Sequence, residues 1–312
     1  MNRPSKVPAR WARSLGFVAA AVALLTACGG GTSQYDPFVA QRVISFGDDA
    51  STLTGSGHRH GVNGLNTDGV FDCRLLPIWT QSLANFYGYV YAECNPDNVE
   101  PRAIMKAAAG ARVADVAAQV ESMGGFRDRD LAAVMAGAHD IFDIYLQYPQ
   151  QPEAVLIEQA RESGRQMARV VNRMVSLGAK VIVANLPDLG LTPYARRESA
   201  DNNDPNRAAL ISRLTTAFNE QLGVTVLLDG RFVGLVQIDL ISQAIGRFPA
   251  AYGFANISDA VCANALPDCT TGTLIENGDA TTYLWASDKQ FAPGGHSQLA
   301  VQAIGRAQSN PF

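Results

Sequence analysis

Hydrophobic positions along the chain fall into short continuous runs and longer segments with helical spacing. The continuous runs predict buried strands at 42–46, 87–92, 130–136, 180–186 and 224–228. Apolar residues at three- and four-residue intervals predict helices at 78–86, 112–123, 153–177, 210–222 and 295–306. Because the strands are apolar throughout and alternate with helices, the pattern predicts a parallel sheet covered by helices on both faces.

Composition narrows the class of protein. The chain has 312 residues, of which 47% are hydrophobic and 17% charged, as is typical of a folded globular protein. With 25 Lys and Arg against 29 Asp and Glu, the net charge is −4. Binding to nucleic acid or to an anionic membrane surface requires a basic excess, so neither is expected. The length suits one large α/β domain or two small ones.

The first residues have the pattern of an export signal. Four basic residues precede an apolar run at 15–25, which is shorter than the roughly 20 residues of a membrane-spanning helix. The sequence Leu25-Thr26-Ala27-Cys28 then resembles a bacterial lipobox. This resemblance implies lipidation of Cys28 and, with Gly29 following it, an outer-membrane location in the bacterial envelope, facing the periplasm or the surface. We therefore expect a signal peptide at 1–27, a lipidated tether at 28–40 and a domain at 41–312.

Four cysteines remain once Cys28 is assigned to the lipid. An even number of cysteines in an oxidising compartment predicts two disulfides. Three pairings are possible, and proximity in the sequence favours Cys73 with Cys94 and Cys262 with Cys269. A zinc site is the alternative, but neither pair has the spacing of a zinc motif. We expect no metal and no cofactor.

Short motifs follow the predicted strands in a fixed order. They are Phe46-Gly47-Asp48, Ala109-Gly110-Ala111, Gly137-Ala138-His139-Asp140, the segment at 186–193 and Gly295-His296. Together they resemble the SGNH/GDSL hydrolase family over nearly the whole chain from Arg42. The resemblance implies a flavodoxin-like three-layer α/β/α sandwich with a parallel sheet. It also implies cleavage of carboxylic esters by a serine, with a glycine and an asparagine in the oxyanion hole.

The residues at the catalytic positions of the family are different in this chain. Asp49 stands where the family has its serine, His139 replaces the asparagine, and Gln290 replaces the histidine base. Gly110 matches the oxyanion-hole glycine, and Asp288 or the preceding serine falls near the acid position. A serine mechanism needs a hydroxyl and a base to deprotonate it. Asp49 has no hydroxyl and the amide of Gln290 does not titrate, so serine-type ester hydrolysis should not operate.

Asp49 and His139 are expected to face one pocket beyond the strand ends. A carboxylate beside an imidazole stabilises the imidazolium, so we expect a raised pKa for His139. Three arrangements remain open: an inert ion pair that fills the oxyanion hole, a weak divalent-metal site that includes Asp288, and an altered acid–base site.

The other polar candidates have structural explanations. His58 and His60 lie in a Gly-rich stretch that predicts a solvated loop, and His296 is expected to be a structural residue at a helix start. Asp188 follows a strand and fits a turn or a helix cap. Asp48 and Asp140 match family positions that belong to the scaffold.

The sequence thus indicates a lipid-anchored envelope protein that is a pseudo-hydrolase and serves as a ligand-binding or scaffold module for acyl, glycan or cell-wall ligands. One alternative is an active carboxylic ester hydrolase with an unusual residue set. Another is a surface protein that binds a partner while the cleft is vestigial. The nitrogen of His296 or of another imidazole ring within contact distance of the Asp49 carboxylate would undo the argument for inactivity.

Overall fold

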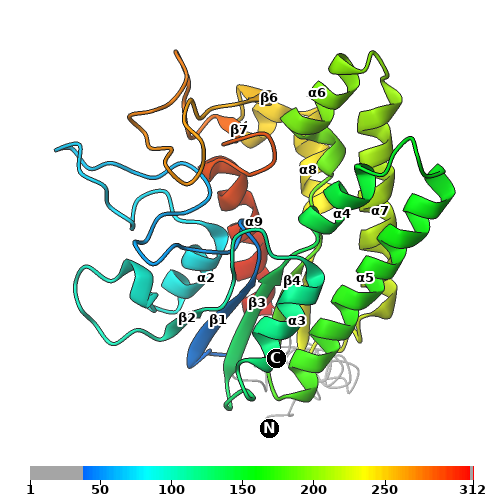
Figure 1. The fold of residues 1–312 in the computed structure, drawn as a ribbon. Helices are drawn as coiled ribbons and strands as arrows, with labels where there is room; N and C mark the ends of the chain where they lie inside the picture. The colour runs from blue at the N-terminus through cyan, green and yellow to red at the C-terminus, as the bar shows by residue number, and fades with distance from the viewer. Residues whose placement is uncertain (1–37, 310–311) are drawn as a thin grey trace, which may run out of the picture. The chain divides into compact units, whose positions relative to one another are not determined.

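The computed structural model describes residues 38–309 and 312, and its centre is a five-stranded parallel sheet with the order β2-β1-β3-β4-β5 (Figure 1). The strands are β1 (Arg42–Gly47), β2 (Ala103–Met105), β3 (Asp130–Met135), β4 (Lys180–Ala184) and β5 (Val233–Val236). This order is that of flavodoxin-like folds, and the expected three-layer architecture is confirmed.

Helices cover both faces of the sheet. One face carries α2 (Trp79–Phe86), α8 (Ile238–Arg247) and α9 (Pro293–Ser309). The other carries α3 (Val113–Glu121), α4 (Ala138–Tyr145), α5 (Glu153–Ser176) and α7 (Asn206–Thr225), with α6 (Pro193–Asp201) packed on α7. Successive strand residues point to opposite faces, so Val43 packs among residues of α2 and α9, whereas Ile44 packs among residues of α3, α5 and α7.

Smaller elements lie in the loops of the described chain. They are the short 3₁₀ helices η1 (Ala92–Cys94), η2 (Leu189–Leu191) and η3 (Pro249–Tyr252), and the parallel pair β6 (Asn256–Ala260) and β7 (Tyr283–Trp285). The segment between β7 and α9 lines a cavity together with residues that follow β1, so it reaches the carboxyl ends of the main strands.

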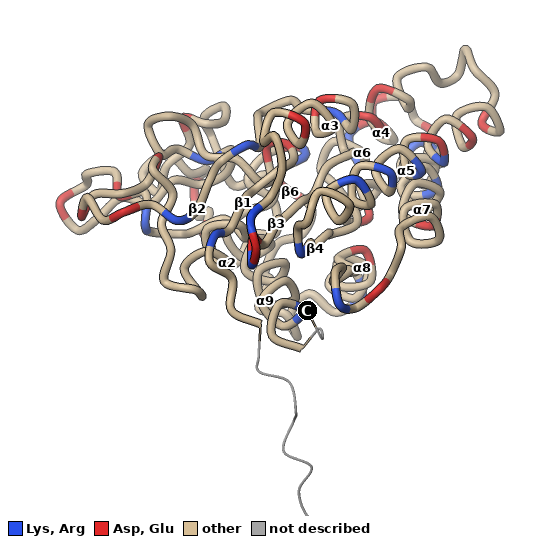
Figure 2. Tube along the Cα trace, turned by 90° about the horizontal axis from the view of Figure 1, so that it is seen from below, with Lys and Arg blue, Asp and Glu red and all other residues tan. Residues whose placement is uncertain are grey.

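The surface helix α5 carries charges of both signs, as Figure 2 shows. Arg165 pairs with Glu158 and Glu162, and Arg169 also pairs with Glu162. Such exposed pairs contribute little each, but they neutralise one another along the helix. Within the part of the chain that is described, no helix is long and apolar enough to cross a bilayer.

Two predicted strands are wrong. Residues 87–92 leave α2 through a turn in which Gly88 has a φ of +75°, and there only Tyr91 forms a bridge, to Ala103 of the true edge strand. Residues 224–228 are not a strand because α7 continues to Thr225, and the side chain of Val224 is exposed. The strand expected there is β5, a few residues later.

Both expected disulfides are confirmed, Cys73–Cys94 and Cys262–Cys269. The expected helices are present, although α7 and α9 extend beyond the predicted ranges, and α4, α6 and α8 were not predicted. The signal peptide, Cys28 and most of the tether lie outside the described residues. At the end of the tether range, Ala40 is buried, and its carbonyl accepts a hydrogen bond from the Tyr89 hydroxyl at 2.6 Å.

Candidate functional site

The turn after β1 places Asp49 at the carboxyl edge of the sheet. Gly47 ends the strand with a φ of +127°, and a Cβ there would lie 2.1 Å from the carbonyl oxygen of Met135. Only glycine therefore lets β1 run this close to β3 before the chain turns. The amide of Ala50 donates to the Asp48 carboxylate at 3.1 Å and fixes the turn.

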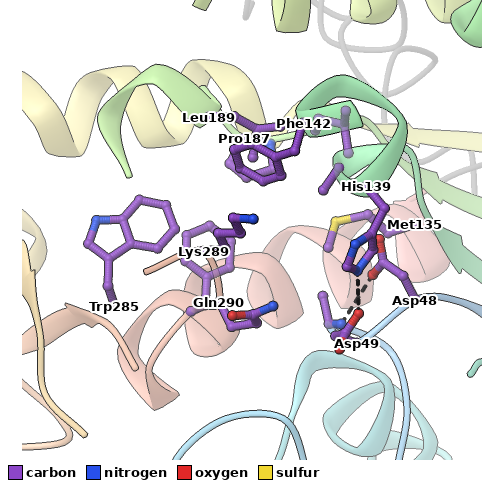
Figure 3. A pocket seen from close by; sticks show the side chains of 14 residues that line it. Asp48, Asp49, Met135, His139, Phe142, Pro187, Leu189, Trp285, Lys289 and Gln290 are labelled. Carbon is purple, nitrogen blue, oxygen red and sulfur yellow. Dashed lines mark hydrogen bonds and ion pairs between the residues drawn. The ribbon is translucent and has the colours of Figure 1, made fainter. Parts of the chain in front are cut away.

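His139 and Gly110 approach the same oxygen of Asp49. The Nε2 of His139 lies 2.5 Å from Oδ2 of Asp49 (Figure 3). The backbone N–H of Gly110 donates to that oxygen at 2.8 Å. His139 is in the first turn of α4, which begins directly after β3. The structure thus brings together Asp49 and His139, which the strand ends predicted, and Gly110, which the family resemblance implied.

This arrangement makes Asp49 and His139 an ion pair at neutral pH. Burial alone would raise the pKa of Asp49, but the hydrogen bonds from His139 and Gly110 outweigh it and lower the pKa to about 2. The hydrogen bond to Asp49 raises the pKa of His139 against the opposing effect of burial, as expected. Burial and the charge of Asp49 raise the pKa of the adjacent Asp48 to about 7.

His60 was missed as a site residue, because the prediction of a solvated loop is wrong for it. Its Nδ1 lies 3.4 Å from Oδ1 of Asp49, and its side chain is only 17% exposed. The preceding Arg59 is buried and donates to the carbonyl of Cys73 at 2.6 Å, which holds the loop inward. His58, by contrast, stacks on Phe71 away from Asp49, with ring centroids 4.0 Å apart.

The segment at 287–290, which precedes α9, places only one of its two expected residues at the site. Asp288 does not join Asp49 and His139, because its carboxylate pairs with the guanidinium of Arg197 and is 44% exposed. The metal set that includes Asp288 is therefore wrong, and residues 38–309 contain no cluster of three or more His, Cys, Asp or Glu side chains that could hold a metal. Gln290 does line the cavity, and its amide oxygen accepts a hydrogen bond from Ser287.

His296 takes no part in the pair. It lies in the first turn of α9, is 2% exposed, and neither ring nitrogen has a hydrogen-bond partner among the described residues. Burial lowers its pKa to about 3, so the ring is neutral. Asp188 has the expected capping role, since its carboxylate accepts the N–H of Gly190 at 3.0 Å in η2. Asp140 accepts the N–H of Val113 at 3.1 Å and is likewise part of the scaffold.

A narrow cavity of about 40 Å³ opens beside the ion pair. Its walls are mostly apolar side chains, contributed by Met135, Phe142, Leu186, Pro187, Leu189, Trp285 and Phe291. Lys289 also faces the cavity and was not predicted (Figure 3). A mostly apolar lining with a few polar groups is the usual composition of a small-molecule site.

The strand order and the position of the cavity define the class of protein. It is an α/β protein in which loops at the carboxyl ends of parallel strands form the site. Residues 7–274 match the GDSL-like Lipase/Acylhydrolase family, and the chain belongs to this family. The resemblance seen in the sequence is thereby confirmed.

Three solved structures of lipolytic proteins are similar to this chain at low sequence identity. A member of the lipolytic protein G-D-S-L family from Veillonella parvula DSM 2008 is 12% identical, with a TM-score of 0.43 and coverage of 85% of this chain and 97% of that chain. A lipase from a goat rumen metagenome is 11% identical, with a TM-score of 0.48 and coverage of 88% and 100%. The lipase/acylhydrolase from Enterococcus faecalis is 12% identical, with a TM-score of 0.42 and coverage of 86% and 95%. No curated protein matches the chain.

Proposed function

We propose that this GDSL-family protein binds a ligand in its cavity and does not hydrolyse esters. The observation that carries the proposal is the convergence of His139 and Gly110 on Oδ2 of Asp49. In the family pattern these two positions serve the oxyanion of the reacting ester. Here both groups already contact the Asp49 carboxylate. The negative charge of this carboxylate would repel a developing oxyanion.

A base is also missing. Gln290 occupies the base position, and its amide cannot accept a proton at neutral pH. His139 is held as an imidazolium by Asp49, so its Nε2 cannot take a proton from water. His296 is neutral, but it does not itself line the cavity, because its buried ring packs behind Phe291 with the ring centroids 6.1 Å apart. Nucleophile and base are thus replaced together, which supports a pseudo-hydrolase.

An active hydrolase is the second candidate, and it is favoured by the very contact that was named from the sequence as evidence against inactivity. The ring nitrogens of His139 and His60 lie 2.5 Å and 3.4 Å from Asp49. An imidazole oriented by a carboxylate activates water once the imidazole is neutral. Such an enzyme would work only in alkaline solution, because the pKa of His139 is raised.

Hydrolysis of p-nitrophenyl esters of several chain lengths, from neutral to alkaline pH, separates the two candidates. We expect no turnover above that of the buffer. Turnover that persists in the purified protein and disappears in the Asp49→Ala variant would overturn the proposal. The matched control is Asp97→Ala, which removes an exposed carboxylate in another loop.

The same proposal places the protein in the bacterial cell envelope, anchored by lipid on Cys28. Its support is the sequence alone, since a basic start and a short apolar run precede Leu25-Thr26-Ala27-Cys28. The tether of about ten residues between Cys28 and Phe38 would keep the domain close to the membrane. The ligand is expected to be an acyl or glycan group that matches the apolar and aromatic walls of the cavity.

A further inference from the structure

Lys289 brings a positive charge to the cavity. Its Nζ lies over the rings of Phe142 and Tyr194, 4.5 Å and 4.3 Å from their centroids. Its amine forms no ion pair with any carboxylate between residues 38 and 309. The ammonium group therefore faces the cavity with aromatic faces as its main favourable contacts.

The neighbouring acids are already engaged elsewhere. Asp288 pairs with Arg197, and Asp143 pairs with Arg112 at 2.6 Å. Glu198 accepts a hydrogen bond from the Tyr145 hydroxyl at 2.8 Å. Burial lowers the pKa of Lys289 overall, whereas these carboxylates raise it through space, but none of them forms an ion pair with it.

Asp49 and His139 balance each other at the cavity, while burial keeps Asp48 partly protonated by raising its pKa to about 7. Asp49 and His139 form an ion pair, and the N–H of Gly110 is used by the same carboxylate. The hydrogen-bond donors that would normally receive an oxyanion are thus occupied. Lys289 is left as the cationic group that can receive an anion from solution. A half-buried ammonium group without a counter-ion is unfavourable, so an anion would be stabilised beside it.

We infer that the cavity binds an apolar carboxylate, whose carboxylate group pairs with Lys289 while its hydrocarbon part lies against Phe142, Leu189 and Trp285. A phosphate would need more donors than one ammonium group, because it carries more charge and more acceptor oxygens. The walls near Lys289 are mostly apolar or aromatic, and beside it the lining offers chiefly the neutral amide of Gln290. This inference rests on the proposed function, because the cavity holds its ligand without cleaving it.

Isothermal titration of the purified protein with hexanoate and with hexanamide tests the inference. The two compounds have the same carbon chain and differ in charge. We expect hexanoate to bind about tenfold or more tightly than hexanamide, the usual effect of one charge-assisted hydrogen bond. Equal affinity, or no heat with hexanoate, would overturn the inference.

Substitutions locate the binding group. Lys289→Met keeps the aliphatic stem and should abolish the preference for hexanoate, whereas Lys289→Arg should retain it. The matched control is Lys180→Met, because Lys180 also lies over a ring, 4.3 Å from the centroid of Phe232, but at the amino end of β4. Loss of the preference in the control variant, or its survival in Lys289→Met, would contradict the assignment.

A parallel incubation with methyl hexanoate separates this inference from the proposed function. Release of methanol by the protein would show hydrolysis and refute the proposed function, whatever the affinity for hexanoate. Absence of methanol together with absence of hexanoate binding would refute only the carboxylate inference. Binding of hexanoate without methanol release supports both.

Discussion

The imidazole of His139 lies 2.5 Å from the carboxylate of Asp49, so two residues that follow the neighbouring strands β1 and β3 are in direct contact. Both side chains are largely buried, with 27% and 12% of their surfaces exposed. The pair therefore interacts in a medium that screens charge less than water does. The contribution of the pair to the free energy of unfolding depends on pH, because folding shifts the pKa of both groups.

The variant His139→Gln should be destabilised most in mildly acidic solution. Because the pKa of His139 is raised on folding, the ion pair stabilises the protein fully below the pKa of the unfolded chain, about 6.5. This stabilisation is lost as the pH rises through the pKa of the folded protein. The lowered pKa of Asp49 gives stability that is lost as the pH falls toward about 2. The difference in unfolding free energy should thus be greatest between about pH 4 and about pH 6.5, at about 1–3 kcal/mol.

Urea denaturation of both proteins across this pH range measures the difference. The control is His58→Gln, because His58 stacks on Phe71 and does not contact Asp49. A destabilisation that is the same at every pH would show that His139 contributes packing only.

Asp48→Asn should stabilise the protein in neutral and alkaline solution. Burial and repulsion by Asp49 raise the pKa of Asp48 to about 7, so the folded protein holds a proton that the unfolded chain releases. The unfolding free energy of the wild type should therefore fall as the pH rises from about 4 through about 7. Asparagine can still accept the N–H of Ala50, and we expect a gain of at least about 1 kcal/mol above neutral pH.

Thermal unfolding at several pH values checks this prediction, with Asp97→Asn as the control for removal of one exposed charge. If the unfolding temperatures of the variant and the wild type change with pH in parallel, Asp48 does not hold the proton.

The sequence was sufficient for most of the fold because the strands are continuously apolar and the long helices have regular spacing. It failed at 224–228, where five consecutive residues include valine and leucine but the helix continues to Thr225. The apolar run predicted burial, yet Val224 and Leu227 are 74% and 70% exposed. Only the packing of α7 distinguishes these exposed residues from those of a buried strand.

The residues of the candidate site that directly follow a strand could be predicted from the sequence. Asp49 and His139 directly follow neighbouring strands of a parallel sheet, and the carboxyl ends of such strands meet at one edge. His60 and Lys289 lie in irregular segments, whose positions depend on long-range contacts. Asn63, for example, bonds the carbonyl of Cys269 at 3.0 Å and so fixes the loop that carries His60. The spacing of hydrophobic residues in the sequence does not predict such a long-range contact.

The double variant Asp49→Ser with Gln290→His should restore slow reaction with fluorophosphonate probes. Serine would supply the hydroxyl and release the N–H of Gly110, and histidine would supply the base at the cavity. The acid partner would still be missing, since Asp288 pairs with Arg197. We expect labelling about 10²-fold or more faster than with either single variant, because nucleophile and base act as a unit.

In-gel fluorescence of the labelled protein gives the rate. The control for labelling elsewhere is the double variant Asp49→Ala with Gln290→His, which has the base but no hydroxyl. Equal labelling of the single and double variants would indicate that the side chain at position 290 does not reach position 49.

Cys28→Ala should release the protein from the membrane fraction. Lipid chains on Cys28 would provide the anchoring, because the chain has no basic excess for attraction to lipid headgroups. Labelling of cells with a palmitate analogue, followed by fractionation, checks both the modification and the location. An unlabelled wild-type protein in the soluble fraction would refute the proposed anchor.

The two disulfides should contribute unequally to stability. Cross-linking lowers the entropy of the unfolded chain more when the closed loop is longer. The Cys73–Cys94 bond spans 21 residues and the Cys262–Cys269 bond spans 7. The loop-entropy relation then gives about 3 kcal/mol for the first bond and about 2 kcal/mol for the second. Denaturant unfolding of the double-serine variant of each pair measures these losses, with the other bond intact as the internal control. A larger loss for Cys262–Cys269 would mean that its native contacts outweigh the entropy of the loop.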